Sequence, residues 1–270
     1  MAGIVLGLGA VGFFGSGDRA PWGAPGRIER SYSTKVDPKW KDIYIDWHRT
    51  FTSRRSGCPP TTVSIGSIRR PAEVHMPGSV SMLYMAMSLD GYIAGPHDGP
   101  DNPGGDGFMR LHDWFVDANG EFVRPSGPGG ELFDELETFG AVLAGRRTVE
   151  QVDHWGGDHH GAPIFVPSHR PPGPSVANYP LVTYVAEGIA SAMAQAKAAA
   201  GDRFVLVHGA YTAQRALAVG VLDELQISQI PVLFGGGRRL FELLPSRIEL
   251  EIVRVVDTPQ ATHIHYRVQR

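Results

Sequence analysis

Cysteine is almost absent from this chain. Its 270 residues include a single cysteine, Cys58, so no disulfide can form within one chain and no zinc site can be built from cysteines. One thiol is compatible with a reducing compartment, and we expect the protein to be cytoplasmic.

An excess of charge of either sign is also lacking. The chain carries 25 Lys and Arg residues against 28 Asp and Glu residues, a formal net charge of −3. Such a chain has no net field that would attract nucleic acid or an anionic membrane. We therefore expect a small-molecule substrate, with neither nucleic acid nor a membrane as partner. The assembly that we expect is a homodimer.

Residues 1–79 lack the regular patterning of the rest of the chain. They begin with glycines at the G-x-G-x-x-G spacing of a dinucleotide-binding loop, but the glycines and prolines that follow exclude the required helix. The same apolar start has the length of a signal-peptide core, yet no Lys or Arg precedes it. It is also too short and glycine-rich to span a membrane. We interpret residues 1–79 as an N-terminal extension, poorly ordered or partly packed on a domain formed by residues 80–270.

Strands and helices alternate after Val80. Apolar spacing predicts three helices, each ended by a glycine, over residues 131–139, 191–200 and 212–219. The last segments alternate in period two without long crossovers, which predicts antiparallel strands over residues 225–231, 248–257 and 262–268. The predicted fold is α/β, a single mixed and mostly parallel sheet flanked by helices, with antiparallel C-terminal strands.

Residues 141–148, Ala-Val-Leu-Ala-Gly-Arg-Arg-Thr, carry the strongest signal of a ligand site. The four apolar residues predict a strand buried on both faces, and Gly145 lets the backbone turn where a side chain would obstruct a ligand. If a helix begins near Thr148, its free N–H groups, together with Arg146 and Arg147, form a site for a phosphorylated cofactor. The alternative is a strand that ends in two solvated arginines.

Three other segments accompany this one in order: a strand and Asp-Gly turn in 82–94, a strand with a glycine near its end in 204–210, and a triple-glycine loop in 231–237. Together the four segments resemble the dihydrofolate-reductase-like superfamily, and in particular the C-terminal reductase domain of the bacterial riboflavin-biosynthesis deaminase-reductase. The resemblance covers residues 80–270. The zinc deaminase half of that bifunctional enzyme needs a Pro-Cys-x-x-Cys element, which this chain lacks.

The resemblance implies an NADPH site at the carboxyl ends of the parallel strands. After Gly145, the residues Arg146, Arg147 and Thr148 would contact the cofactor's phosphates, with an arginine placed to favour the 2′-phosphate. Ser168 would lie beside the adenosine part. The alternative for Ser168 is a plain polar loop ahead of two prolines.

A second part of the implied cofactor site follows the next strand. Gly209, which precedes Ala210, matches one glycine of the pair that the family places beneath the pyrophosphate, whereas His208 replaces the other. A histidine can lie beside a phosphate, yet its bulk can also redirect the cofactor. Gly235 and Gly236 form another loop that either brings backbone close to a ligand or only turns the chain.

Asp90 is the candidate catalytic residue, because a carboxylate just after the first strand would face the substrate pocket of this family. The alternative is an Asp-Gly turn residue that caps its own loop. We predict no metal site in the histidine-rich run 153–160, since adjacent histidines rarely point at one ion. That run instead predicts a substrate-facing loop in which Trp155 covers an aromatic substrate.

These features predict an NADPH-dependent oxidoreductase that transfers a hydride to a small heterocyclic or carbonyl substrate. The resemblance implies an activity similar to that of 5-amino-6-(5-phosphoribosylamino)uracil reductase or dihydrofolate reductase. Two alternatives stay open: a non-catalytic nucleotide-binding or regulatory protein on the same fold, and a flavin-using variant. The loops around the pocket determine the substrate, so the fold does not name it.

Overall fold

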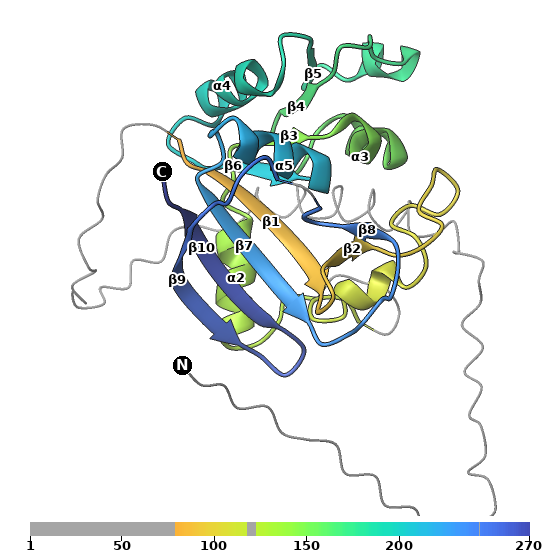
Figure 1. Ribbon diagram of the computed structural model, residues 1–270. Helices are drawn as coiled ribbons and strands as arrows, with labels where there is room; N and C mark the ends of the chain where they lie inside the picture. Colours follow the sequence, from red (N-terminus) through yellow and green to blue (C-terminus); the bar gives the residue numbers. More distant parts are fainter. Residues whose placement is uncertain (1–78, 118–122, 243) are drawn as a thin grey trace, which may run out of the picture. The chain divides into compact units, whose positions relative to one another are not determined.

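The computed structural model describes residues 79–117, 123–242 and 244–270 (Figure 1). All of them belong to one compact unit. The predictions for the glycine motif, the signal peptide and the N-terminal extension therefore lie outside the described residues. Among the described residues, none of the helices has the length and apolar character needed to cross a membrane.

An eight-stranded sheet forms the centre of the domain, with strand order β5-β4-β3-β6-β1-β7-β10-β9. The strands from β5 to β7 are parallel, and β10 and β9 are added antiparallel at one edge. This arrangement confirms the predicted α/β fold. The strands are β1 (Ser81–Ser88), β3 (Ala141–Ala144), β4 (Ile164–Pro167), β5 (Val182–Val185), β6 (Val205–His208), β7 (Glu224–Ile230), β9 (Leu250–Asp257) and β10 (Thr262–Val268), and β2 (Tyr92–Ala94) pairs separately with β8 (Arg238–Arg239).

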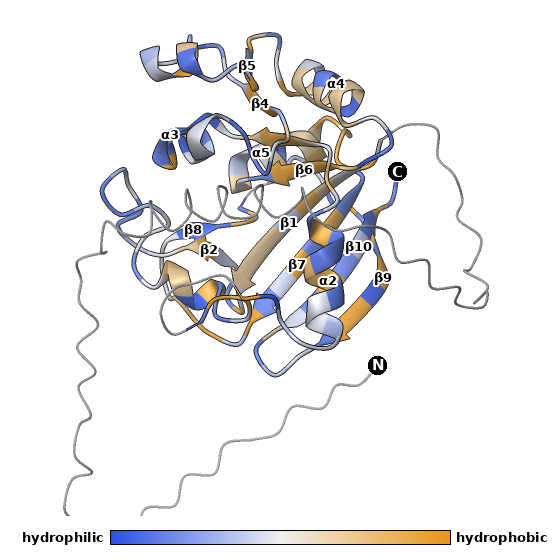
Figure 2. Ribbon diagram, turned by 180° about the vertical axis from the view of Figure 1, so that it is seen from behind, coloured by the Kyte–Doolittle hydropathy of each residue, from blue (hydrophilic) through white to orange (hydrophobic). Residues whose placement is uncertain are grey.

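Helices cover both faces of the sheet. The α-helices are α2 (Pro128–Leu136), α3 (Arg146–Gln151), α4 (Ile189–Ala200) and α5 (Ala210–Ala218), and short 3-10 helices are η2 (Phe108–Leu111), η3 (Asp153–Gly157) and η4 (Pro174–Asn178). Successive residues of β3 point to opposite faces of the sheet. Leu143 packs with the alanines of α4 and α5 on one face, and Val142 packs with Val149 of α3 on the other. Leu132 of α2 packs on the latter face, beside β1 and β7. Figure 2 shows α2 lying across β7 and β10 on that face.

The helices begin two or three residues earlier than the sequence predicts. In α2, Pro128 occupies the first turn, where its missing N–H costs nothing, and the helix ends at Leu136. Phe139 is therefore not on its apolar face and joins the core around Val142. The start of α3 at Arg146, directly after Gly145, matters more, because it places both arginines in the first helical turn.

Residues 79–81 are part of the folded domain. The Ser79 hydroxyl donates to the Arg203 carbonyl at 2.6 Å, and the Val80 carbonyl accepts from the Val205 N–H at 2.8 Å. The Ser81 hydroxyl donates to the Val221 carbonyl at 2.7 Å. A chain that starts at Met82 loses all of these bonds, whereas one that starts at Met76 keeps them.

We expect the chain that starts at Met82 to be less stable than the chain that starts at Met76 by about 2–5 kcal/mol, since each lost hydrogen bond contributes about 0.5–1.5 kcal/mol. Urea denaturation of the two shortened chains and the full chain measures this difference. Equal stability of the two shortened chains would show that residues 79–81 contribute nothing to the core.

Candidate functional site

A cavity of about 690 Å³ opens where β3, β4 and β6 end. Its walls also include the central strand β1, the loop around Asp98, and the beginnings of α4 and α5. The cavity brings together eight of the residues that the sequence assigns to the cofactor: Gly145, Arg146, Arg147, Thr148, Ser168, His208, Gly209 and Ala210. It lies at the carboxyl ends of parallel strands, where ligands bind in open α/β sheets.

Three helix amino ends meet at this cavity. Gly145, Gly188 and Gly209 are the N-cap residues of α3, α4 and α5, and all three line the cavity wall. Within the described residues, no side chain caps any of these three helices. The first-turn N–H groups of a helix have no intrahelical partner, so the three ends together offer donors to an anion.

Gly145 and Gly209 face threonine side chains across the seam between β3 and β6. A Cβ atom on Gly145 would lie 2.7 Å from Thr212 Oγ1, and one on Gly209 would lie 2.9 Å from Thr148 Oγ1. Gly209 also has a φ of +92°, which L side chains rarely adopt. Both positions therefore require glycine, and we call Gly145, Thr148, Gly209 and Thr212 the glycine-threonine cradle.

Replacing Gly145 with alanine is expected to destabilise the protein by about 1–3 kcal/mol through overpacking, because the new Cβ atom would lie 2.7 Å from Oγ1 of the buried Thr212. The backbone of Gly145, at φ −69° and ψ 145°, suits alanine, so the contact with Thr212 is the whole cost. Adding Thr212→Ala should then remove the penalty relative to Thr212→Ala alone. A penalty that persists in the double variant, measured by urea denaturation, would contradict this account of the cradle.

Arg146 joins α3 to the loop after β4. Its Nη1 donates to the Arg170 and Pro171 carbonyls at 2.9 and 2.8 Å and to Ser168 Oγ at 3.3 Å. Its Nε lies 2.7 Å from a Glu150 carboxylate oxygen. The side chain is therefore fixed beside Ser168, which is where the sequence places the adenosine part of a cofactor.

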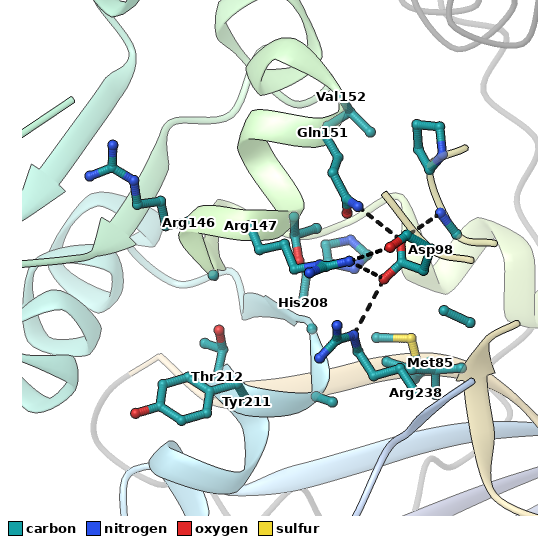
Figure 3. Close-up of a pocket in the computed structure, with 18 of the residues that line it drawn as sticks. Met85, Asp98, Arg146, Arg147, Gln151, Val152, His208, Tyr211, Thr212 and Arg238 are labelled. Carbon is teal, nitrogen blue, oxygen red and sulfur yellow. Dashed lines mark hydrogen bonds and ion pairs between the residues drawn. The ribbon is translucent and has the colours of Figure 1, made fainter. Parts of the chain in front are cut away.

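Arg147 takes part in a separate cluster around Asp98 (Figure 3). Its Nη2 donates to the Asp98 carboxylate at 2.9 Å, and Gln151 Nε2 donates to the same carboxylate at 2.8 Å. Arg238 Nε, from β8, lies 3.4 Å away. Burial alone would raise the pKa of Asp98, but the hydrogen bond from Gln151, one from a backbone N–H and the charge of Arg147 outweigh it and lower that pKa. Asp98 is therefore a carboxylate at neutral pH.

Rings form another part of the cavity wall. Phe108, His112, Phe115 and Trp155 line the cavity there, and the His208 ring lies 5.7 Å from that of Trp155. Burial lowers the pKa of His112 to about 4, and burial together with the charges of His112 and His160 lowers that of His208 to about 4. Both imidazoles are consequently neutral at pH 7, and the wall is suited to a flat, uncharged ring.

The turn that carries Trp155 has a left-handed backbone. Asp153, His154 and Trp155 have φ values of 45°, 56° and 52°, a conformation that costs about 1–2 kcal/mol per residue. The Tyr179 hydroxyl donates to the Asp153 carboxylate at 2.8 Å, and His154 Nε2 lies 2.8 Å from the Tyr184 hydroxyl. These contacts hold the Trp155 ring, 5% exposed, in the cavity wall. Backbone strain of this kind is often found at binding sites.

Residues 81–264 match the family described as the RibD C-terminal domain. This chain belongs to the RibD C-terminal domain family. The match covers more than half of the chain and includes the cradle, the arginines and Asp98. It confirms the family resemblance that the four sequence segments indicate.

Individual proteins are also similar to this chain. The uncharacterized protein YwjB of Bacillus subtilis (strain 168) is 28% identical over 191 residues, which cover 69% of this chain and 96% of that protein. A solved protein of Shewanella sp. PV-4, described as a riboflavin biosynthesis protein, is 24% identical with a TM-score of 0.55, over 71% of this chain and 99% of that chain. Dihydrofolate reductase from Enterococcus faecalis, complexed with NADP(H), is 18% identical with a TM-score of 0.46, over 71% of this chain and 97% of that chain.

Asp90 lies outside the cavity wall of this RibD C-terminal domain. Its carboxylate accepts from the Ser88 hydroxyl at 2.6 Å and from the N–H groups of Phe234 and Gly235 at 3.0 and 2.7 Å. The hydrogen bond from Ser88 is the main cause that lowers the pKa of Asp90 to about 2. In this geometry Asp90 is a turn carboxylate that holds a neighbouring loop, which is the alternative role considered from the sequence. A catalytic role for Asp90 stays an untested prediction.

Gly235 and Gly236 are likewise not in the cavity wall. The Gly235 N–H is used by Asp90, so the triple-glycine loop is joined to the Asp-Gly turn. A ligand role for these two glycines also stays an untested prediction. In the histidine-rich run, the His159 and His160 rings stack at 4.7 Å, and in the described part of the chain no group of three or more His, Cys, Asp or Glu residues is placed to hold a metal.

Sequence reasoning missed several residues of the site. Asp98 follows His97 in a loop dense in glycine and proline, a composition that predicts turns but no partner. Tyr84 lies in the segment 82–94, but nothing in that segment marked its side chain as part of a site, and His112 had no motif around it. Both residues line the cavity. The period-two pattern of β1 would have placed Tyr84 and Ala86 on the same face.

Proposed function

We propose that this protein is an NADPH-dependent reductase that transfers a hydride to a small heterocyclic or carbonyl substrate. The observation that carries the proposal is the meeting of three uncapped, glycine-led helix amino ends with Arg146 and Arg147 at one cavity. Donors of this kind suit a ligand with several phosphates. Membership of the RibD C-terminal domain family supports the same activity.

The residues present fit a phosphorylated dinucleotide. The cradle leaves no room for a Cβ atom at Gly145 or Gly209, so backbone N–H groups can approach a pyrophosphate there. Arg146, held beside Ser168, and the exposed Arg170 would be the residues that contact a 2′-phosphate. A bound nicotinamide would supply the hydride. The protein then has to orient the substrate ring and exclude water, which the wall of Phe108, Phe115 and Trp155 can do.

A second candidate function is binding of a nucleotide without catalysis, and His208 favours it. This histidine replaces a family glycine at the end of β6 and lies beside the cradle. Its ring, however, packs toward Trp155 and His159, at 5.7 and 5.6 Å, and so extends along the ring wall. The phosphate donors of the cradle do not separate NADPH from a flavin nucleotide, so a flavin-using variant remains the third candidate.

Titration with NADPH, NADH and FMN, followed by tryptophan fluorescence, separates these candidates, because Trp155 lies in the cavity wall. We expect NADPH to bind most tightly and to be oxidised when carbonyl or heterocyclic compounds are added. Tight binding without any oxidation would favour the non-catalytic candidate, and a preference for FMN would favour the flavin variant. The homodimer and the cytoplasmic location stay predictions.

A further inference from the structure

A chain of polar side chains crosses the sheet from the cavity toward the turn between β9 and β10. Tyr84 lines the cavity, and its hydroxyl oxygen lies 3.4 Å from Ser228 Oγ. Ser228 Oγ lies 2.8 Å from His263 Nδ1, and His263 Nε2 lies 3.5 Å from Thr258 Oγ1. The strands β1, β7 and β10 are adjacent, with Ala86, Ser228 and His263 paired in register.

This chain is buried in an otherwise apolar region. Ser228 and His263 are 0% and 1% exposed, and the Trp114 ring lies 4.6 Å from that of His263. Ala86 and Ile230, their neighbours on β1 and β7, belong to the surrounding core. Buried polar groups are costly unless they are hydrogen-bonded. Ser228 contacts both Tyr84 and His263, and His263 Nε2 lies 3.5 Å from Thr258 Oγ1, whose hydroxyl donates at rest to the Ala261 carbonyl at 2.8 Å. The polar contacts are therefore continuous from the cavity to Thr258. Thr258 itself is only half-buried.

We propose that Tyr84 is the proton donor of the reduction, and that Ser228 and His263 resupply its proton from the side of Thr258. This inference rests on the proposed reductase function and assigns a role that hydride transfer alone leaves open. A hydride added to a C=O or C=N bond leaves negative charge on the oxygen or nitrogen, which must receive a proton.

The other titratable groups in the cavity are less suited to this task. Asp98 is held as a carboxylate by Gln151 and Arg147, and so has no proton to give. His112 and His208 are neutral at pH 7, and a neutral imidazole is a poor acid. The hydroxyls of Thr148, Ser168 and Thr212 lie at the phosphate end. Tyr84 lies on the central strand β1. Among the cavity residues that the structure describes, its phenol alone contacts the buried polar chain, through Ser228 Oγ.

The proton count balances along the chain. The hydride forms a C–H bond on the substrate, and the Tyr84 O–H bond breaks as its proton forms the new O–H or N–H bond. Ser228 then gives its hydroxyl proton to the Tyr84 phenolate while His263 Nδ1–H gives its proton to Ser228 and Nε2 gains one, in a single concerted transfer that forms neither an alkoxide nor an imidazolate. The proton gained at Nε2 comes from solvent through Thr258, whose hydroxyl gives up its bond to the Ala261 carbonyl to donate to His263. The imidazole thus changes tautomer without becoming charged. Burial lowers the pKa of His263 to about 4, which keeps it neutral as this exchange requires.

Nitrogen-15 NMR of the cofactor-free protein tests the direction in which the hydrogen bonds of this polar chain run. The proposal requires that His263 rest with its proton on Nδ1, donating to Ser228, and that this signal change when Tyr84→Phe or Ser228→Ala interrupts the chain. A resting proton on Nε2, with Nδ1 accepting from Ser228, would mean that the chain runs in the wrong direction and would overturn the proposal. The wild-type protein alone decides this point, even if a variant fails to fold.

Two hydride acceptors test the role of Tyr84 in single turnovers with NADPH. Reduction of 4-nitrobenzaldehyde needs a proton with the hydride, whereas reduction of the 10-methylacridinium cation needs none. Tyr84→Phe should lower the rate of aldehyde reduction by about 10²-fold or more, and should leave the rate of acridinium reduction within about twofold of the wild type. Ser228→Ala should slow only the aldehyde, by a smaller factor. The control is Tyr266→Phe, which removes a phenol from the other face of the sheet and should change neither rate.

The outcomes separate the two proposals. If Tyr84→Phe slows both acceptors equally, or neither, Tyr84 has a structural role or none, and the proton-donor assignment is wrong. If the wild-type protein binds NADPH but reduces neither acceptor, the reductase function itself fails.

Discussion

Replacing Arg146 and Arg147 together with alanine is expected to weaken NADPH binding by about 10²–10⁴-fold, because about two charge-assisted hydrogen bonds of about 1.5–3 kcal/mol each are lost, chiefly those that the Arg146 guanidinium would make to the 2′-phosphate. NADH, which lacks the 2′-phosphate, should lose much less. Fluorescence titration of the double variant with both cofactors measures the difference. Arg267→Ala, which removes an exposed arginine from β10, is the control and should bind both cofactors as the wild type does.

The structure divides this effect between the two arginines. Arg146 is fixed beside Ser168, whereas Arg147 is paired with Asp98 (Figure 3). Arg146→Ala alone should therefore remove most of the preference for NADPH over NADH, and Arg147→Ala should remove little of it. Equal losses for the two cofactors would place the arginines at the pyrophosphate. No loss for either would leave them with the structural roles of joining the loop after β4 and holding Asp98.

Lowering the pH from 7 to 4 is expected to remove several kcal/mol of folding stability. Burial lowers the pKa values of His112, His208 and His263 from 6.5 to about 4 in the folded protein. Below about pH 6.5 the unfolded chain therefore binds more protons than the folded one. The contribution of these histidines to folding stability is fully present above that pH and is lost as the pH falls to about 4. A shift of this size corresponds to at most about 3 kcal/mol for each histidine.

Urea denaturation at several pH values between 7 and 4 measures this loss. His208→Gln should make the pH dependence shallower, because the glutamine side chain does not titrate. His169→Gln, at an exposed position, is the control and should leave the dependence unchanged. A stability that stays constant down to pH 4.5 would contradict the burial of these imidazoles in neutral form.

The sheet was predictable because its signals are local. Ala141–Ala144 are all buried, as an apolar run flanked by helices on both faces of a sheet requires, and β10 occupies the residues that the period-two pattern indicates. Gly145 and Gly209 each follow such a run and precede a helix, so the position of the cradle was also encoded locally.

Contacts between distant segments were not predictable. Asp98 meets Arg147, 49 residues away, and Arg238, 140 residues away. Asp90 is bonded to Phe234 and Gly235, more than 140 residues away, and this bonding turns its carboxylate into a support for a loop. The segments around Asp90, Asp98 and Gly235 are rich in turn residues, which fix local backbone geometry but not the partner that the folded chain brings near.

The central claim, that the helix amino ends hold a phosphorylated nicotinamide cofactor, is tested most directly by amide hydrogen exchange with and without NADPH. The account predicts slower exchange at the beginning of α5, at Tyr211 and Thr212, and at the beginnings of α3 and α4, with smaller changes around Asp90 and the triple-glycine loop. Binding of NADPH that leaves exchange at all three helix amino ends unchanged would contradict it.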